Sequence, residues 1–163
     1  MERRNVILAL AVGILLIVLG IVGYSWWREE RGVGHESAVV SFRLASDRAK
    51  NMSCEVASTP SQWGRGLSGR NSLANGTGML FVFPTPRGES FWMKDTYIPL
   101  DMIFIGGNKT VLKVAQAPTQ LGAPDDQLVR YTADDVLWVV ETNMGYCAAN
   151  GIIPGTNIEV TYL

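Results

Sequence analysis

The chain has 163 residues, and its 14 Lys and Arg side chains nearly balance its 15 Asp and Glu side chains. After residue 33 there are ten basic and twelve acidic side chains, with no basic run, whereas nucleic-acid binding needs a field that attracts phosphates. Charge therefore excludes nucleic acid as an expected partner, and the length allows one domain and an anchor.

The N-terminal part is dominated by an uncharged run over residues 6–24. As a helix with a rise of 1.5 Å per residue, this run would span roughly 28 Å, close to the ~30 Å hydrocarbon thickness of a bilayer. Trp26 and Trp27 follow it, as is typical of a membrane interface. A cleaved signal peptide is the alternative, but the run is longer than a signal-peptide core and lacks a small-x-small site. The sequence predicts a short tail over 1–5, a transmembrane helix over 6–27 in contact with membrane lipid, and a linker over 28–37.

The flanking arginines alone do not indicate how the predicted helix is oriented in the membrane, because two lie on each side of the run. The α-amine tips this balance toward an N-terminus inside the cell. We expect a single-pass protein of the cell membrane with its C-terminal domain outside. Cys54 and Cys147 are the two cysteines of the chain, and an even count suits a disulfide in an oxidising compartment. The alternative is two buried, unpaired thiols.

Residues 38–163 predict one globular domain made mostly of short strands. Alternating or apolar runs predict strands at 38–44, 53–57, 78–83, 90–94, 100–105, 110–115, 136–141 and 157–162. A capping box of Thr59 and Gln62, with Pro60 at the first helical position, predicts a short helix. Asn143 and Gly151 predict the start and end of a second helix. Because no βαβ periodicity is evident, we expect an α+β domain, mainly antiparallel, with a small twisted or barrel-like sheet and two short helices.

Several motifs occur in a specific order through the domain. They are G-L-S-G-R at 66–70, G-M-L-F-V-F-P at 78–84, F-W-M-K-D-T at 91–96, I-P-L-D-M-I-F-I at 98–105, V-V-E-T-N-M-G at 139–145 and G-I-I-P-G at 151–155. This set resembles the domain of unknown function 192 family of bacteria and archaea, over about residues 54–160. The resemblance implies a compact, mainly β domain that is often exported or membrane-anchored, and it implies no reaction. The two cysteines are not part of these motifs.

The residue inventory excludes several kinds of catalytic site. His35 is the only histidine and lies in the predicted linker, so no Ser-His or Cys-His pair is expected inside the domain. A zinc site would need ligands from the linker, the first strands and the last helix, so no metal is expected. No glycine-rich phosphate loop joins a strand to a helix, so no cofactor is expected.

Two carboxylates in apolar surroundings are the candidates for chemistry. Asp101 lies between Leu100 and Met102, and Glu141 ends the most apolar strand. In a functional interpretation they form a pair for acid/base work or cation binding, and Arg70 holds an anionic group. In the structural interpretation, which we favour, Asp101 bonds to backbone amides of the 96–100 turn and Arg70 clamps it.

Tryptophans give a second candidate surface. Strand alternation places Trp92 and Lys94 on the face opposite Phe91 and Met93. An exposed Trp92 beside Lys94 would suit stacking on a sugar or a peptide, and the alternative is that Trp92 belongs to the core. Trp63 and Trp138 are expected in the core.

Three functions remain open. The first is a binding or accessory module of the cell envelope that recognises a glycan or a peptide through Arg70, Trp92, Lys94 and Asp101. The second is a hydrolase or lyase that uses Asp101 and Glu141 as paired carboxylates. The third is a structural or assembly partner of another membrane protein, acting through the glycines at 13, 20 and 23.

Overall fold

The computed structural model describes residues 14–21, 36–46 and 48–163. The chain divides into two units at residue 34, and each is described by itself. In the first unit, residues 14–21 are helical with exposed side chains. Within the described ranges, no helix has both the length and the apolar character needed to cross a bilayer. The remainder of the predicted transmembrane segment, 6–13 and 22–27, and most of the predicted linker lie outside the described residues.

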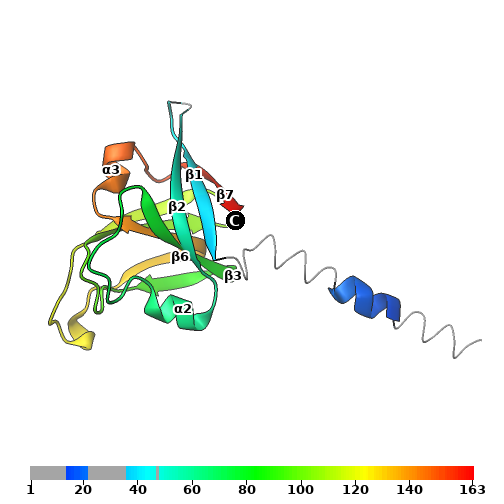
Figure 1. The fold of residues 1–163 in the computed structure, drawn as a ribbon, viewed down its shortest axis with the longest axis horizontal. Helices are drawn as coiled ribbons and strands as arrows, with labels where there is room; N and C mark the ends of the chain where they lie inside the picture. The colour runs from blue at the N-terminus through cyan, green and yellow to red at the C-terminus, as the bar shows by residue number, and fades with distance from the viewer. Residues whose placement is uncertain (1–13, 22–35, 47) are drawn as a thin grey trace, which may run out of the picture. The chain divides into compact units, whose positions relative to one another are not determined.

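The second unit is a mainly antiparallel β domain with a few short helices, which confirms the predicted α+β class. Its strands are β1 (Ser37–Arg43), β2 (Ala49–Ala57), β3 (Thr77–Phe91), β4 (Leu100–Gly106), β5 (Val111–Ala117), β6 (Tyr131–Asn143) and β7 (Asn157–Tyr162). Its helices are α2 (Pro60–Arg65), the 3-10 turn η1 (Asp125–Gln127) and α3 (Tyr146–Asn150). In Figure 1, α2 and α3 lie at opposite ends of this domain.

All seven strands belong to one sheet in the order β5-β4-β6-β3-β2-β1-β7. The two outermost strands meet where each begins, because Thr110 and Asn157 form an antiparallel bridge. The Val111 amide also donates to the Thr156 carbonyl at 2.9 Å, and the Ile158 amide donates to the Lys109 carbonyl at 2.9 Å. The sheet is therefore closed at this point, as the barrel-like expectation requires.

One strand pair departs from the antiparallel expectation. β2 and β3 are parallel, with Cys54 opposite Gly78 and Val56 opposite Leu80. Parallel neighbours need a crossover that returns the chain to the same end of the sheet, and residues 58–76, with α2 at their start, supply it. The capping box predicted α2, but its six residues are too few to show helical periodicity, so the parallel pairing across it was not predicted.

β3 is a single long strand where two were predicted. It runs through Pro84 and Pro86 to Phe91, and its register with β6 shifts between Val82 and Arg87. Prolines are tolerated there because a bulge leaves backbone groups out of the ladder. The predicted strand over 90–94 was wrong beyond Phe91, where the chain turns into the loop that carries Trp92 and Lys94.

The central strands are buried on both faces. Every residue of β4 is buried, as are residues 78–83 of β3 and 136–142 of β6. One core contains Ile103 and Ile105 together with Val140. The other contains Met102 and Phe104, which alternate with Ile103 and Ile105 along β4 and therefore point to the opposite face of the sheet. The second core lies on the side that is covered by the crossover and by the loop after β3, and this side holds the candidate site.

The two α-helices begin differently. For α2 the predicted capping box is present: the Gln62 amide donates to the Thr59 hydroxyl, and the Thr59 amide donates to Gln62 Oε1 at 3.0 Å. The prediction that Asn143 caps α3 was wrong. Gly145 is the cap residue, in the left-handed conformation, and Asn143 Nδ2 donates to the Leu73 carbonyl at 2.9 Å. The predicted end of α3 at Gly151 is confirmed by its left-handed φ of 70°.

Candidate functional site

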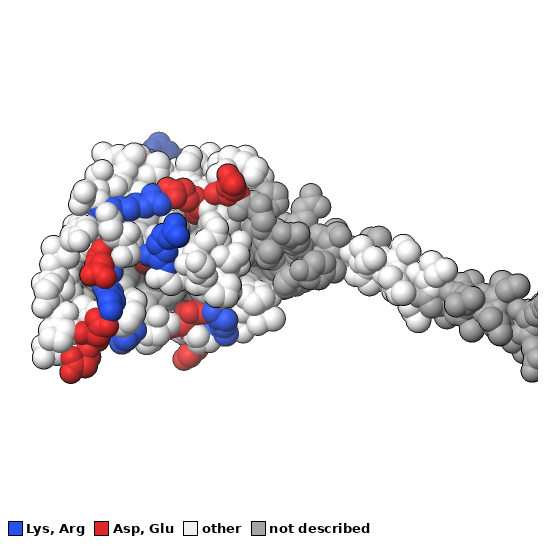
Figure 2. Space-filling model, turned by 60° about the horizontal axis from the view of Figure 1, so that its bottom comes forward, with Lys and Arg blue, Asp and Glu red and all other residues white. Residues whose placement is uncertain are grey.

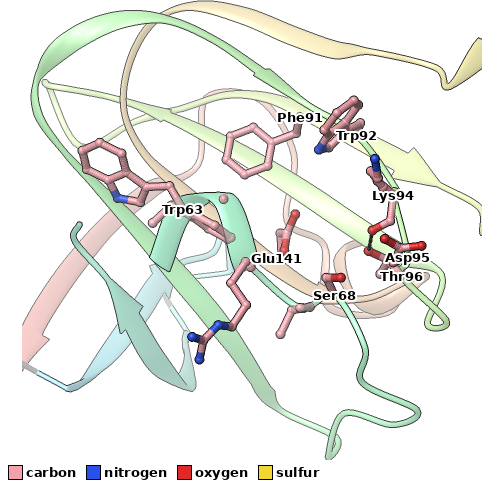
Figure 3. Close-up of a pocket in the computed structure, with 13 residues that line it drawn as sticks. Trp63, Ser68, Phe91, Trp92, Lys94, Asp95, Thr96 and Glu141 are labelled. Atoms are coloured by element: carbon pink, nitrogen blue, oxygen red, sulfur yellow. Dashed lines mark hydrogen bonds between the residues drawn. The ribbon is translucent and has the colours of Figure 1, made fainter. Parts of the chain in front are cut away.

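A pocket of about 200 Å³ lies between the crossover and the loop that follows β3. Its walls come from residues 63–68 on one side and 91–96 on the other, and Phe81 and Glu141 complete it from β3 and β6. Figure 3 shows Glu141 in the middle of the labelled residues, with Trp63 on one side and Lys94, Asp95 and Thr96 on the other. The volume is below the roughly 300–1,000 Å³ of sites for drug-sized ligands, so it suits one small chemical group.

The crossover wall requires glycine at its closest approach to the strands. Gly66 ends α2 with a positive φ of 48°. A Cβ atom at this position would lie 3.3 Å from the ring of Phe81 and 3.8 Å from Glu141 Oε2. The backbone conformation and the limited space therefore both favour glycine here. The wall is tied to the opposite loop by the Gly69 amide, which donates to the Asp95 carbonyl at 2.8 Å.

The loop after β3 forms the opposite wall. Asp95 adopts a φ of 50°, which is unusual for a residue with a side chain. The Thr96 hydroxyl donates to the Lys94 carbonyl at 3.1 Å, the bond drawn in Figure 3, and this bond closes the turn. Trp92 is half-buried, with the Arg130 guanidinium 3.8 Å and the Lys94 ammonium 5.5 Å from its ring centroid. These cation–π contacts hold the indole at the pocket rim.

Aromatic rings supply much of the remaining lining. Trp63 is half-buried, and its indole N–H donates to the Ala57 carbonyl at 3.0 Å. Phe81 and Phe91 meet edge to face with their centroids 4.9 Å apart. Phe91 in turn meets Phe104 of the core edge to face at 5.9 Å. The rings are thus held in place by the core beneath them.

Glu141 is the one carboxyl group that is both buried and turned into this pocket. Its side chain is only 5% exposed, and within the described part of the chain it has no hydrogen-bond or ion-pair partner. Burial raises the pKa of Glu141 from 4.5 to about 8. At neutral pH Glu141 is therefore mainly the protonated acid, which can donate as well as accept a hydrogen bond.

Asp101 lies on the other face of the sheet. Asp101 is opposite Thr142, one residue beyond Glu141, so the two carboxyl groups point to opposite sides. Asp101 is 1% exposed and its Oδ2 accepts from the Cys147 amide at 2.8 Å in the first turn of α3. The structure therefore does not bring Asp101 and Glu141 together as a carboxylate pair. The structural interpretation was right that Asp101 binds a backbone amide, but it placed that amide in the wrong segment.

Arg70 and Lys94 pair with other acidic residues and not with Asp101. Arg70 forms a two-pronged ion pair with Glu55, with both N···O distances at 2.5 Å, and this pair holds the pKa of Glu55 below its usual value. Lys94 pairs with Asp125. Arg70 lies beside a separate, more apolar hollow near the start of β3. Of the predicted binding residues, Trp92 and Lys94 lie at the pocket, and Arg70 and Asp101 do not.

The two cysteines are free thiols, and both are buried in the core that contains Ile103. This is the second of the two alternatives that the sequence left open. Burial raises the pKa of Cys54 to about 12, and burial with the nearby Asp101 raises the pKa of Cys147 further. Both groups are therefore neutral and unreactive under ordinary conditions. In the ranges that the structure describes, no three His, Cys, Asp or Glu side chains lie close enough to hold a metal ion.

Sequence reasoning missed several parts of the pocket. Trp63 was expected in the core, but it lines the pocket, whereas Trp138 is buried as expected. Ser68, Asp95 and Thr96 were not singled out as site residues. The signal that could have found them is the clustering of motifs, because G-L-S-G-R and F-W-M-K-D-T supply the two facing walls.

Comparisons with known proteins agree with the resemblance noted in the sequence. The family model of DUF192, described as an uncharacterized ACR, matches residues 42–160. A crystal structure from Sinorhizobium meliloti 1021, described as that of a candidate transcription regulator, is 33% identical with a TM-score of 0.70, and the match covers 78% of this chain and 96% of that one. A protein of unknown function from Novosphingobium aromaticivorans DSM 12444 is 31% identical with a TM-score of 0.67, over 74% of this chain and 83% of that one. No curated protein gives a match to this sequence.

Proposed function

This chain belongs to the DUF192 family, and from the geometry of its pocket we propose that it is a ligand-binding module, which holds one small group of an envelope glycan or peptide. The observation that carries the proposal is the buried carboxyl group of Glu141. It lies among aromatic rings and has no partner in the described residues. A polar group in such surroundings costs free energy unless something bonds to it. A ligand group that enters the pocket would supply that bond.

The walls suit a glycan or a peptide because they combine ring surfaces with polar atoms. Trp63, Phe91 and Trp92 offer apolar surface to a sugar ring or to an aliphatic side chain. Ser68 and Thr96 add hydroxyl groups at the same pocket. Few convergent polar groups within an apolar lining are typical of sites that bind small molecules.

A hydrolase or lyase with paired carboxylates is not favoured by this geometry. Such chemistry needs two carboxyl groups on the same side of the reacting bond or flanking it in one cleft. Asp101 and Glu141 point to opposite faces of the sheet, and Asp101 is bonded to the start of α3. Glu141 is then the one buried carboxyl group at this pocket, and binding is the function that it supports best.

The description of the Sinorhizobium meliloti protein as a candidate transcription regulator is not carried over to this chain. Residues 34–163 carry two more acidic than basic side chains. On the face shown in Figure 2, the basic and acidic side chains alternate and leave no basic stripe. DNA binding depends on clustered positive charge, so no feature of this surface favours it.

The location that we propose is the outer face of the cell membrane, with residues 6–27 as an anchor in lipid. The uncharged run over 6–24 and the aromatic residues after it support this proposal. A linker over 28–37 would keep the pocket within a few tens of ångströms of the membrane surface. The ligand would then be a component of the cell envelope.

Ligand-observed NMR on the full chain in detergent micelles tests the binding function. The panel contains N-acetylglucosamine oligomers, glucosamine oligomers and tripeptides with and without lysine. We expect at least one class to bind wild type, and to bind the Trp92→Ala variant about tenfold more weakly, or ~1.4 kcal/mol. Tyr97→Ala is the matched control, because Tyr97 is an exposed aromatic residue of the same loop outside the pocket lining. If no class binds, or if both variants bind like wild type, the proposed function is wrong.

A further inference from the structure

We propose that the group held in this pocket is a positively charged alkylammonium, with Glu141 as its counter-ion and the rings of Trp63, Phe91 and Trp92 as its walls. This inference rests on the proposed ligand-binding function and names the chemical class of the ligand. An ammonium group of this kind occurs on a lysine-type side chain of a peptide and on an amino sugar. The two sources share the chemistry that the pocket would recognise.

Among the described residues, no cation pairs with Glu141. Two of the cations near the pocket pair with acidic side chains of the protein. Lys94 pairs with Asp125, and Arg87 pairs with Glu89 and lies over the Trp63 ring at 5.1 Å. Arg65 is an exposed residue of the pocket rim. In the described residues Glu141 is therefore a buried acid without a counter-charge, and a ligand with a positive charge would complete it.

The aromatic rings that line the pocket also favour a cation. Aromatic faces attract cations, and the attraction strengthens when water is excluded. Cations already lie over these rings at the rim, where Arg130 and Lys94 lie over Trp92 at 3.8 and 5.5 Å and Arg87 lies over Trp63. Both indoles also line the pocket. Walls of this kind with a carboxyl group between them match an ammonium better than an anion, because the ring faces carry partial negative charge.

The proton on Glu141 gives ammonium binding a distinctive pH dependence. Since burial raises the pKa of Glu141 to about 8, an ammonium that binds at neutral pH must displace a proton from it. Affinity should then rise by up to about tenfold per pH unit between pH 6 and 8, and level off above. The other charged groups at the pocket are Arg65 of α2 and Lys94 and Asp95 of the facing loop. A neutral sugar hydroxyl would show no such rise.

Calorimetry with two matched pairs of probes tests the proposal on the full chain in detergent micelles. Nα-acetyl-lysine methylamide is compared with Nα-acetyl-norleucine methylamide, and glucosamine is compared with N-acetylglucosamine. We expect the charged member of at least one pair to bind at least tenfold more tightly than its neutral partner. The lysine pair is compared at pH 8, and the glucosamine pair at pH 7, because the amine of glucosamine is largely deprotonated at pH 8. With the lysine probe at pH 7, titrations in buffers of different ionisation enthalpy should show release of close to one proton. A preference in the first pair identifies a peptide source, and a preference in the second identifies an amino sugar.

Glu141→Gln keeps the shape of the side chain and removes its charge, so it should abolish both the preference for the charged probe and the proton release. Glu159→Gln is the matched control, because Glu159 is an exposed acid of β7 outside the pocket. Equal binding of charged and neutral probes, no proton release by wild type, or an unchanged preference in Glu141→Gln would each overturn the inference. If neutral probes bind and depend on Trp92, the ligand-binding function stands and the ammonium inference fails. If no probe or panel member binds, both fail.

Discussion

Asp101 and Glu141 occupy adjacent strands and are both buried, yet their surroundings differ. Asp101 accepts a hydrogen bond from the amide of Cys147 and fixes the start of α3 to β4. Glu141 has no partner in the described residues and faces the pocket. One carboxylate thus contributes to the fold, and the other remains available to a ligand. This difference arises from a single step in register, because consecutive residues of a strand point to opposite faces.

Glu141 should make the stability of the domain depend on pH. Its pKa is about 8 in the folded state, against 4.5 for the unconstrained group, so the folded state holds this proton more tightly. The stabilisation is fully present below about pH 4.5, is lost as pH rises toward 8, and stays lost above. We expect the free energy of unfolding of wild type to fall by up to about 1.4 kcal/mol per pH unit in this window, relative to Glu141→Gln. Urea unfolding of both proteins from pH 4 to 9 measures this difference, and parallel curves would contradict the buried acid.

The residues of the site could be predicted only in part. Glu141 was found because a carboxyl group at the end of an apolar strand is conspicuous. Trp92 and Lys94 were also named, but the strand alternation used to place them does not apply, because β3 ends at Phe91. The pairing of Asp101 with Arg70 could not be corrected from sequence, since Glu55 competes for Arg70 from a strand whose parallel neighbour was not predicted. From the sequence one can predict that a buried charge needs a partner. Which residue is that partner depends on the tertiary structure.

At the scale of elements, the crossover over residues 58–76 decides where the pocket lies. It joins the parallel strands β2 and β3 and carries α2 and the wall around Gly66. The strand positions were predicted well because apolar runs and alternation are strong local signals. The crossover and the continuous β3 were not, because a six-residue helix and a bulge beside two prolines leave no periodic pattern.

The capping box of α2 should contribute measurably to this wall. Thr59 accepts from the Gln62 amide, and Gln62 Oε1 accepts from the amides of Ser58 and Thr59. We expect Thr59→Ala to lower the free energy of unfolding by about 1 kcal/mol, because an orphan amide of the first turn loses its acceptor. Thr59→Ser, which keeps the hydroxyl group, should lie within about half of that value of wild type. Thermal or urea unfolding distinguishes the two, and equal losses would show that the hydroxyl group is not the stabilising feature.

At the scale of the whole molecule, the chain combines a β domain with an N-terminal unit that contains the uncharged run. The two native thiols are buried in the β domain. An unmodified chain should therefore react little with a polar maleimide, and an introduced cysteine can report which side of a membrane the domain faces.

The proposed orientation predicts that Thr119→Cys is labelled by a membrane-impermeant maleimide in intact cells. Thr119 is exposed on the connection between β5 and β6, so folding does not protect it. Asn5→Cys, on the other side of the uncharged run, should react only after the cells are broken. Labelling in the reverse pattern would place the domain inside the cell, and recovery of the protein away from the membrane fraction would remove the anchor from the proposal.

The contact between the first residues of β5 and β7 has a consequence for how this domain can meet other chains. An open sheet edge offers unpaired amides and carbonyls, to which an extended peptide or a second copy can add as another strand. Here Thr110 and Asn157 join the two outer strands, and the amides of Val111 and Ile158 are already bonded across the join. An incoming strand would have to break these bonds before it gained any of its own. Recognition at this seam by strand addition is therefore costly.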